Sequence, residues 1–328
     1  MRKALLVGID YYESENIPNL HGCVNDASKV NNMLAQNAHD DSPNFDIDLL
    51  LAENRETRVT RHALKDKMDR LFLEGNSNIA LFYFSGHGYL ETTGGWLCTS
   101  ESDRGDDGVS LREVVAFANK SKATNKVIIL DSCHSGAAAE RELGEKISEI
   151  GEGVTVLTAS TADQYALESE GGGIFTGLLL DALGGAAANL TGDITPGAIY
   201  AYIDQSLGAW DQRPVFKTNV KNFVSLRKVK PPLPLTDLRR LTQFFPKGKD
   251  EYFLDPTYEP DDSQKQSNAD KAIPEHTEIF AILQKYNRVN LVLPVEAEHL
   301  YYAAMNRKSV RLTAFGRHYR NLVFKNRI

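Results

Sequence analysis

The sequence predicts an α/β domain built on a mostly parallel β-sheet with helices on both faces. The first observation is a series of short, nearly continuous apolar runs bounded by Gly, Asp and Ser. Such runs, rich in β-branched and aromatic residues, are typical of strands that are covered on both faces. The second observation is that helical patterns separate these runs, as in chains of β-α-β units. Together they predict this architecture for the larger, amino-terminal part of the chain.

The expected elements alternate along the chain. The strands are the apolar runs "ALLVGID" at 4–10, "FDIDLLL" at 45–51, "NIALFYFSG" at 78–86, "KVIILDS" at 126–132 and "VTVLTAS" at 154–160. The helical patterns between and after them cover Cys23–Gln36, Thr57–Phe72, Leu111–Lys120, Phe175–Leu183 and Thr195–Leu207. Ligands of such sheets bind beyond the carboxyl ends of the strands, so the residues that follow each strand are the functional candidates.

Composition narrows the class of protein. The chain of 328 residues is long enough for two units, and its 42% hydrophobic and 25% charged residues are typical of a soluble globular protein. A net charge of −7 argues against nucleic acid or an anionic membrane as the partner of the whole chain, although it does not exclude a local basic patch.

The cysteines and the apolar runs indicate the compartment. Cys23, Cys98 and Cys133 are widely spaced, without a CxxC pair, which indicates reduced thiols rather than a disulfide framework or a zinc site. No apolar run approaches the roughly 20 residues of a membrane helix. The apolar run at the start is too short for a signal sequence with its cleavage site. We therefore expect a cytoplasmic protein with no membrane partner.

The pattern changes in the last third of the chain. Between Lys230 and Glu278 lie seven of the twelve prolines and acidic stretches such as "EPDDSQKQSNAD", which are typical of segments that bury too little apolar surface to fold. The sequence therefore predicts an α/β domain over 1–228, a linker over 229–272 and a small α+β unit over 273–328. In this last unit we expect a helix, a strand, a helix, a short strand and a terminal helix.

Two strand ends carry the candidates for catalysis. His87 follows the strand that ends in "SGHG", and Cys133 follows the strand that ends in "DSCHSG", 46 residues later. Because parallel strands end at one edge of a sheet, both side chains are expected at the same edge. A thiol peptidase needs a nucleophile, a base that titrates near neutral pH and hydrogen-bond donors for the oxyanion. Cys133 and His87 supply the first two, and the backbone amides of Gly88 and Cys133 are the natural oxyanion donors.

Two other interpretations of these residues remain. Cys133 is a small buried hydrophobe in the simplest interpretation, since free cysteine usually behaves as an inert apolar group. The adjacent His134 is a competing base, but neighbouring side chains at a strand end tend to point to opposite sides, which favours His87.

The motifs "SGHG" and "DSCHSG" resemble those of the caspase and metacaspase clan, and within it the bacterial metacaspase-like (orthocaspase) proteins. The resemblance covers about residues 1 to 227 and includes "GCVNDA" near the start and "GGIFTGLLLDAL" in the second half. A histidine about 50 residues before the cysteine is a caspase feature. Asp131 and Ser132 replace the Gln-Ala that precedes the cysteine in caspases, and this difference is the one that distinguishes metacaspases. The resemblance implies a cysteine endopeptidase on a caspase-like fold.

The resemblance also implies a specificity pocket. In metacaspases the primary pocket is similar to "GCVND" here, together with the serine of "SGHG" and the aspartate of "DSC", which implicates Cys23, Asp26, Ser85 and Asp131. A site with two carboxylates favours a basic side chain, so cleavage after Arg or Lys is expected rather than after Asp. The alternative is that Asp26 caps a helix and Asp131 is a turn residue. Ser160 is a further candidate for this pocket.

Two acidic or charged loops carry weaker predictions. The loop 137–153 lies where the family joins its large and small subunit segments, so Arg141 and Lys146 are candidate sites of self-cleavage. The stretch "ESDRGDDG" offers oxygen ligands for calcium, which metacaspases often need, at Glu101, Asp103, Asp106 and Asp107. An acidic surface loop is the favoured interpretation of this stretch, because the fuller acidic pattern of the family is shortened here and no EF-hand spacing is present, and nothing in the sequence requires a cofactor.

The carboxy-terminal unit is basic where the chain as a whole is acidic. From His299 to Ile328 there are seven Lys or Arg residues and no acid. The ending "SVRLTAFGRHYRNLV" resembles the wing and last helix of winged-helix domains. This unit is expected to bind either a regulatory protein or DNA, through its phosphates.

Three functions remain, and the first is favoured because both residues of the dyad and the residues of the pocket are present. The first is a cysteine endopeptidase that cleaves protein or peptide substrates after Arg or Lys, and bacterial proteins of this kind are often components of stress or anti-phage responses. The second is a catalytically silent scaffold that keeps the caspase fold. The third is a DNA-binding regulator that acts through residues 273–328.

Overall fold

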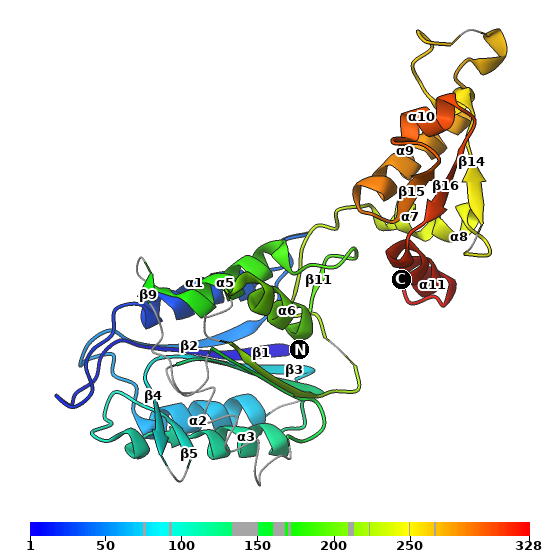
Figure 1. Cartoon of the computed structure of the whole chain (residues 1–328). Helices are drawn as coiled ribbons and strands as arrows, with labels where there is room; N and C mark the ends of the chain where they lie inside the picture. The colour runs from blue at the N-terminus through cyan, green and yellow to red at the C-terminus, as the bar shows by residue number, and fades with distance from the viewer. Residues whose placement is uncertain are drawn as a thin grey trace. The chain divides into compact units, whose positions relative to one another are not determined.

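The computed structural model describes residues 1–74, 77–91, 94–132, 150–159, 168–169, 172–208, 213–222, 224–248, 250–265 and 267–328. The chain folds into two compact units, Met1–Lys230 and Pro231–Ile328 (Figure 1).

The first unit is built on a six-stranded sheet with the order β12-β8-β7-β3-β1-β2. Its strands are β1 (Arg2–Ile9), β2 (Asp46–Ala52), β3 (Ile79–Ser85), β7 (Asn125–Asp131), β8 (Val154–Thr158) and β12 (Val215–Asn219). The first five are parallel, and β12 pairs antiparallel with β8 at one edge. The expected fold class, a mostly parallel sheet flanked by helices, is therefore confirmed.

Helices cover both faces of this sheet (Figure 1). On one face lie α1 (Cys23–Ala35), α5 (Ile174–Asp181) and α6 (Pro196–Ser206), and on the other lie α2 (Arg61–Phe72) and α3 (Leu111–Lys120). All five helices and all five parallel strands lie within a few residues of the ranges that the sequence predicts.

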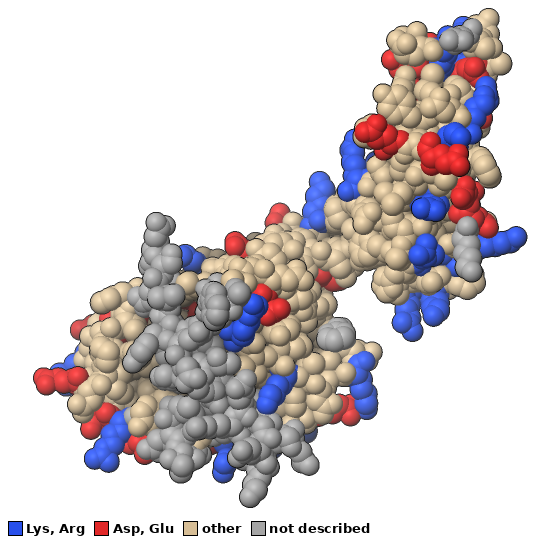
Figure 2. Space-filling model, in the orientation of Figure 1, with Lys and Arg blue, Asp and Glu red and all other residues tan. Residues whose placement is uncertain are grey.

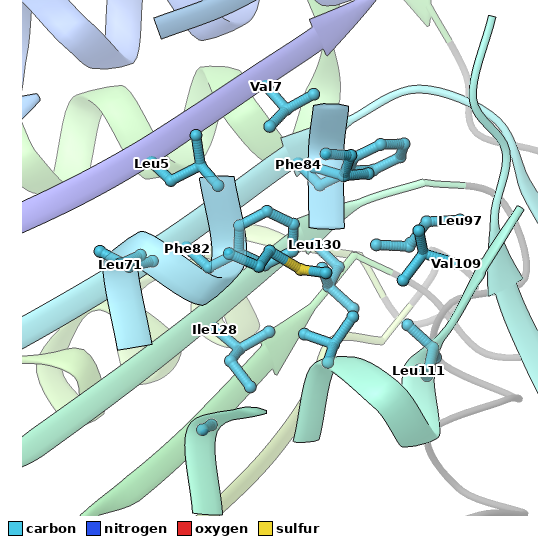
Figure 3. Packing of buried hydrophobic residues seen from close by; sticks show 14 of the residues in the cluster. Leu5, Val7, Leu71, Phe82, Phe84, Leu97, Val109, Leu111, Ile128 and Leu130 are labelled. Atoms are coloured by element: carbon cyan, nitrogen blue, oxygen red, sulfur yellow. The ribbon is translucent and has the colours of Figure 1, made fainter. Parts of the chain in front are cut away.

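The strands are apolar at nearly every position because each face packs on helices. In β3 every residue is buried, and its side chains alternate between the two cores. Phe82 and Phe84 point to the α2 and α3 side, where they pack with Ile128 and Leu130 of β7 (Figure 3). Burial of such a side chain contributes roughly 1.5–3 kcal/mol, so the two cores dominate the stability of this unit.

Local hydrogen bonds set where the helices begin. The Thr60 hydroxyl accepts from the backbone N–H of Ala63 and starts α2, four residues later than the expected start at Thr57. The hydroxyl of Thr57 instead accepts the backbone N–H groups of Glu53 and Asn54 in the preceding turn. Side-chain caps of this kind satisfy N–H groups that have no partner within the helix.

Small elements beside the sheet were not predicted. The strands β4 (Gly88–Glu91), β5 (Gly94–Leu97) and β6 (Val109–Ser110) form a three-stranded antiparallel sheet directly after His87. A 3-10 turn, η1 (Gly105–Asp107), precedes β6. Two further pairs of short strands are β9 (Glu168–Ser169) with β10 (Gly172–Gly173), and β11 (Asp193–Ile194) with β13 (Arg227–Lys228). These strands are too short for an alternation pattern to reveal them.

The second unit differs from the expected linker and small domain. Residues 231–272, expected as most of a linker over 229–272, belong to this unit and form α7 (Leu235–Arg239), α8 (Leu241–Phe244), β14 (Glu251–Phe253) and the 3-10 turns η3 (Pro256–Tyr258) and η4 (Asn268–Asp270). They are ordered by tertiary contacts, since Leu233, Leu238, Leu241 and Phe245 are fully buried and β14 pairs with β16. The average composition of the segment does not reveal that these few apolar residues are buried.

The rest of this unit follows the expected order of elements: α9 (Pro274–Arg288), β15 (Val292–Val295), α10 (Leu300–Met305), β16 (Ser309–Leu312) and α11 (Ala314–Phe324). The three strands form an antiparallel sheet in the order β14-β16-β15. No helix in the described part of the chain is long and apolar enough to cross a membrane.

Several basic side chains of this unit bond within it. Arg307 and Lys308 pair with Asp270 and Glu296, at 2.6 and 2.7 Å. Arg320 is buried and donates to the carbonyl oxygens of Phe245 and Pro246. The visible face of the unit carries acidic and basic side chains side by side (Figure 2).

Candidate active site

The sheet register brings three strand ends together. Gly8 of β1 pairs with Ser85 of β3, and Ser85 pairs with Asp131 of β7. His87 and Cys133 therefore each follow a paired position by two residues. Cys133 and the competing His134 lie outside the described residues, so the geometry of the dyad stays a prediction.

The segment after β1 holds His87 in place. The backbone N–H of His87 donates to the Tyr12 hydroxyl at 2.8 Å, and the two rings pack with centroids 4.9 Å apart. The Nε2 atom of His87 lies 2.8 Å from the carbonyl oxygen of Pro18. The carbonyl of His87 accepts the N–H of Cys98 at 3.0 Å, which ties the other side of the residue to the segment after β5.

The contact with Pro18 defines the tautomer of His87. A carbonyl oxygen only accepts hydrogen bonds, so Nε2 carries the proton in this geometry. In neutral His87 the proton acceptor is then Nδ1. A histidine held at Nε2 by a carbonyl oxygen uses Nδ1 as its proton acceptor, and a proton acceptor is what a histidine needs to activate a nucleophile.

Two buried carboxylates lie at the same edge of the sheet. Asp26, in the first turn of α1, is 3% exposed, and its Oδ2 accepts the backbone N–H of Gly173 at 2.9 Å. Asp131, the last residue of β7, is 7% exposed, and its Oδ2 accepts from the Thr176 hydroxyl at 2.5 Å. That hydroxyl is also 2.6 Å from the Tyr83 hydroxyl. The start of α5 thus holds both carboxylates.

Cys23 and Ser85 complete this cluster. The side chains of Cys23 and Ser85 share a hydrogen bond. Burial raises the pKa of the Cys23 thiol, and the charges of Asp10, Asp131 and Asp26 raise it further, so this thiol is neutral. Burial also raises the pKa of Asp131 to about 6, with Asp26 as the nearby charge that adds to the shift. The structure therefore brings together Cys23, Asp26, Ser85 and Asp131.

Neither aspartate has the purely local role that was the alternative. The amino terminus of α1 is capped by Asp10, whose carboxylate accepts the N–H groups of Cys23 and Val24 at 2.9 and 3.4 Å. The helix starts without a side-chain cap from its own N-cap residue, Gly22. The carboxylates of Asp26 and Asp131 instead reach partners near residue 175, far along the chain.

Some predicted site residues cannot be placed. Ser160, Arg141 and Lys146 lie outside the described residues, as Cys133 does. Gly88, the other expected oxyanion donor, is the first residue of β4 and directly follows His87.

The acidic loop lies beside His87. A depression of about 430 Å³ is lined by His87, Gly88 and Tyr89 from one segment, by Asn16, Ile17 and Pro18 from a second, and by Cys98, Asp103, Arg104 and Asp106 from a third. Glu101 accepts the N–H of Arg61, Asp103 accepts from Ser14 and Asn16, and Asp107 accepts the N–H of Arg104. Within the described ranges no group of three or more His, Cys, Asp or Glu residues is placed to hold a metal ion. Calcium binding stays a prediction.

Sequence reasoning missed the residues that support the site. Tyr12 and Pro18 lie in an irregular segment with no motif, and Thr176 lies within a helix whose pattern indicates only packing. Only Gly173 could have been found from the sequence, because it belongs to the run "GGG" at 171–173, which indicates a place without room for side chains. A side chain at this position would collide with Asp131. A Cβ atom at Gly173 would lie 2.6 Å from the Asp131 Oδ2 atom.

Comparisons with known proteins agree with this fold. The caspase domain family model matches residues 1–223. Metacaspase-1 of Schizosaccharomyces pombe is 36% identical over 88 residues, which are 26% of this chain and 20% of that protein. Metacaspase-1 of Mycosarcoma maydis is 28% identical over 161 residues, 42% of this chain and 37% of that protein. The chain thus spans well under half the length of these curated relatives.

Solved structures share the fold at low sequence identity. Caspase-1 from Spodoptera frugiperda matches with a TM-score of 0.50 and 12% identity over 70% of this chain and 90% of its own. A Geobacter sulfurreducens protein matches with a TM-score of 0.52 and 18% identity over 70% of this chain and 98% of its own. With its parallel sheet, its "SGHG" and "DSCHSG" strand ends and the family match over residues 1–223, the chain belongs to the caspase domain family.

Proposed function

We propose that the protein is a cysteine endopeptidase that cleaves its substrates after Arg or Lys. The observation that carries this proposal is the pair of buried carboxylates, Asp26 and Asp131, at the strand edge that also carries His87. Burial of two acids close together is costly unless a cation joins them. A guanidinium or ammonium group supplies that cation, and Arg additionally matches carboxylates with a planar fork of donors.

The charge balance of the pocket supports a basic substrate residue. Cys23 is neutral because its pKa is raised, so the carboxylates alone set the charge of the cluster. An acidic substrate side chain would add a third carboxylate to Asp26 and Asp131. Caspases that cleave after Asp would need arginines at this place.

In the proposed reaction His87 acts first as a base, then as an acid and then again as a base. His87 removes the thiol proton of Cys133 through Nδ1. The thiolate then attacks the backbone carbonyl carbon of the substrate's Arg or Lys residue. The N–H groups of Gly88 and Cys133 donate to the oxyanion. Protonated His87 then gives its proton to the leaving amine, which leaves a thioester on Cys133. Water, activated by His87, hydrolyses the thioester and restores the thiol.

The test compares fluorogenic peptides with Arg, Lys or Asp at the cleavage position. We expect turnover of the Arg and Lys peptides, none of the Asp peptide, and loss of all turnover in Cys133→Ala and His87→Ala. Asp26→Asn should weaken turnover of the Arg peptide through a higher KM. Turnover of the Asp peptide, or turnover that persists in Cys133→Ala, would refute the proposal.

The remaining expectations are tested with the same protein. Assays with added calcium and with a chelator decide whether Asp103, Asp106 and Asp107 serve a metal. Mass spectrometry of incubated wild type and Cys133→Ala decides whether the chain cleaves itself after Arg141 or Lys146. If no peptide is cleaved under any condition, the catalytically silent scaffold becomes the better proposal.

A role for the second unit is proposed separately. Regulation by a partner protein is favoured over DNA, because Arg307, Lys308 and Arg320 bond within the unit. Binding of duplex DNA by the whole chain that weakens steeply between low and moderate salt would favour DNA instead. A cytoplasmic role in bacterial stress or anti-phage signalling stays a proposal of the same kind.

A further inference from the structure

The segment between β1 and α1 wraps around His87. It forms two hydrogen bonds with His87, at the backbone through Tyr12 and at the ring through Pro18, and the Tyr12 ring packs on the imidazole. These contacts come from residues 12–18, which form neither helix nor strand. The position of the imidazole therefore depends on what holds this segment.

Tyr12 is the buried end of this segment. It is 4% exposed, although Glu13 and Asn16 beside it are exposed. Its hydroxyl accepts the His87 N–H at 2.8 Å, and its ring packs against the imidazole at an angle of 56°. Its own N–H donates to the Oδ1 atom of Asn19 at 2.7 Å, directly beside Pro18. Tyr12 thus connects the backbone of His87 to the turn that holds Nε2.

Nothing in the proposed chemistry uses the Tyr12 hydroxyl. Burial raises its pKa well above the ordinary value, so the hydroxyl stays protonated and does not act as a base. The Tyr12 side chain is large and buried, and its hydroxyl accepts the backbone N–H of His87, so it is suited to orienting that histidine. The space is tight, because a Cβ atom at Gly86 would lie 2.9 Å from this hydroxyl.

We propose that Tyr12 is a positioning residue that, with Asn19, holds His87 in the tautomer protonated at Nε2. This inference rests on the proposed peptidase function. The acceptor at Pro18 selects the tautomer, and Tyr12 keeps the backbone of His87 and the turn of Pro18 at a fixed separation. A base that is displaced by about 1 Å loses on the order of a hundredfold in rate. Loss of one of these hydrogen bonds should therefore lower kcat measurably.

The decisive variant is Tyr12→Phe, which removes the hydroxyl and keeps the ring. We expect kcat for an Arg peptide to fall about tenfold while KM stays the same, because Asp26 and Asp131 are untouched. Tyr11→Phe is the matched control, since it removes the same group from the adjacent residue. Unchanged kcat in Tyr12→Phe, or a raised KM with unchanged kcat, would overturn the proposal.

A second readout does not depend on turnover. The ring nitrogen resonances of His87, assigned by comparison with His87→Gln, report which nitrogen carries the proton. We expect the Nε2–H form in the wild type and a mixture of tautomers in Tyr12→Phe. If the wild type cleaves no peptide, the proposed function fails, and the resonances still decide the role of Tyr12.

A third variant tests the proposal if Tyr12→Phe does not fold. Asn19→Ala removes the acceptor of the Tyr12 N–H from an exposed position, so it leaves the core intact. It should show the same mixture of tautomers. A single Nε2–H form in Asn19→Ala would contradict the proposal that Tyr12 and Asn19 together hold the tautomer of His87.

Discussion

The raised pKa of Asp131 predicts an unusual dependence on pH. The carboxyl group is buried, and its pKa is shifted from 3.8 to about 6, which corresponds to about 3 kcal/mol against ionisation. With that pKa, about a tenth of the molecules carry neutral Asp131 at pH 7 and about nine tenths do so at pH 5. Because a basic substrate needs the charged form, kcat/KM for an Arg peptide should fall about tenfold for each pH unit below 6.

Stability should change in the opposite direction. A group whose pKa is raised by folding contributes stability that is complete below its unfolded pKa and is lost as the pH rises through its folded pKa. For Asp131 this window lies between pH 3.8 and about 6. The carboxyl groups whose pKa is lowered, such as Glu113 and Asp255, reduce stability only at a more acidic pH. As the pH is lowered from 7 to 5, the activity should therefore fall while the contribution of Asp131 to the free energy of unfolding rises.

The assay must separate Asp131 from the titration of His87. We would measure kcat/KM for an Arg peptide and, in parallel, the rate at which iodoacetamide alkylates Cys133, located by peptide mapping. Alkylation depends on His87 and Cys133 but needs no acidic pocket. In the wild type the acid limb of kcat/KM should lie at a different pH from that of alkylation, and in Asp131→Asn the two limbs should coincide. Limbs that coincide in both proteins would refute the reasoning.

Three further predictions concern the supports of the site and the second unit. Thr176→Val removes a donor from buried Asp131, so the pKa of Asp131 should rise further and the acid limb of kcat/KM should move to higher pH, whereas an unmoved limb would contradict the contact. Gly173→Ala brings a Cβ atom against Asp131, so KM for an Arg peptide should rise without a change in alkylation of the nucleophile; equal KM values would contradict the close approach. Arg320→Met leaves the carbonyl of Phe245 without its donor and should destabilise α11 by about 1–3 kcal/mol, measured by hydrogen exchange in the full chain, with exposed Arg311→Met as control.

The fold class and the residue types at the strand ends follow from the sequence alone. The strand Ile79–Ser85 is apolar in all but its last residue because helices cover both faces of the sheet, and this pattern does not depend on the details of packing. The motifs around His87 and Cys133 identify the residue types that a thiol peptidase needs, and the rule for strand ends assigns them to one edge.

The residues that support the site are set by tertiary contacts. The roles of Tyr12, Pro18 and Thr176 depend on contacts with residues that are distant in the chain, and no local pattern encodes such pairs. The raised pKa of Asp131 depends on burial between elements, which composition does not reveal. The region 231–272 is ordered for a similar reason, because Leu238, Phe245 and a few other buried apolar residues hold a segment whose average composition is polar and rich in proline. Residue types follow from sequence, whereas their distances and burial follow from the packing of the whole chain.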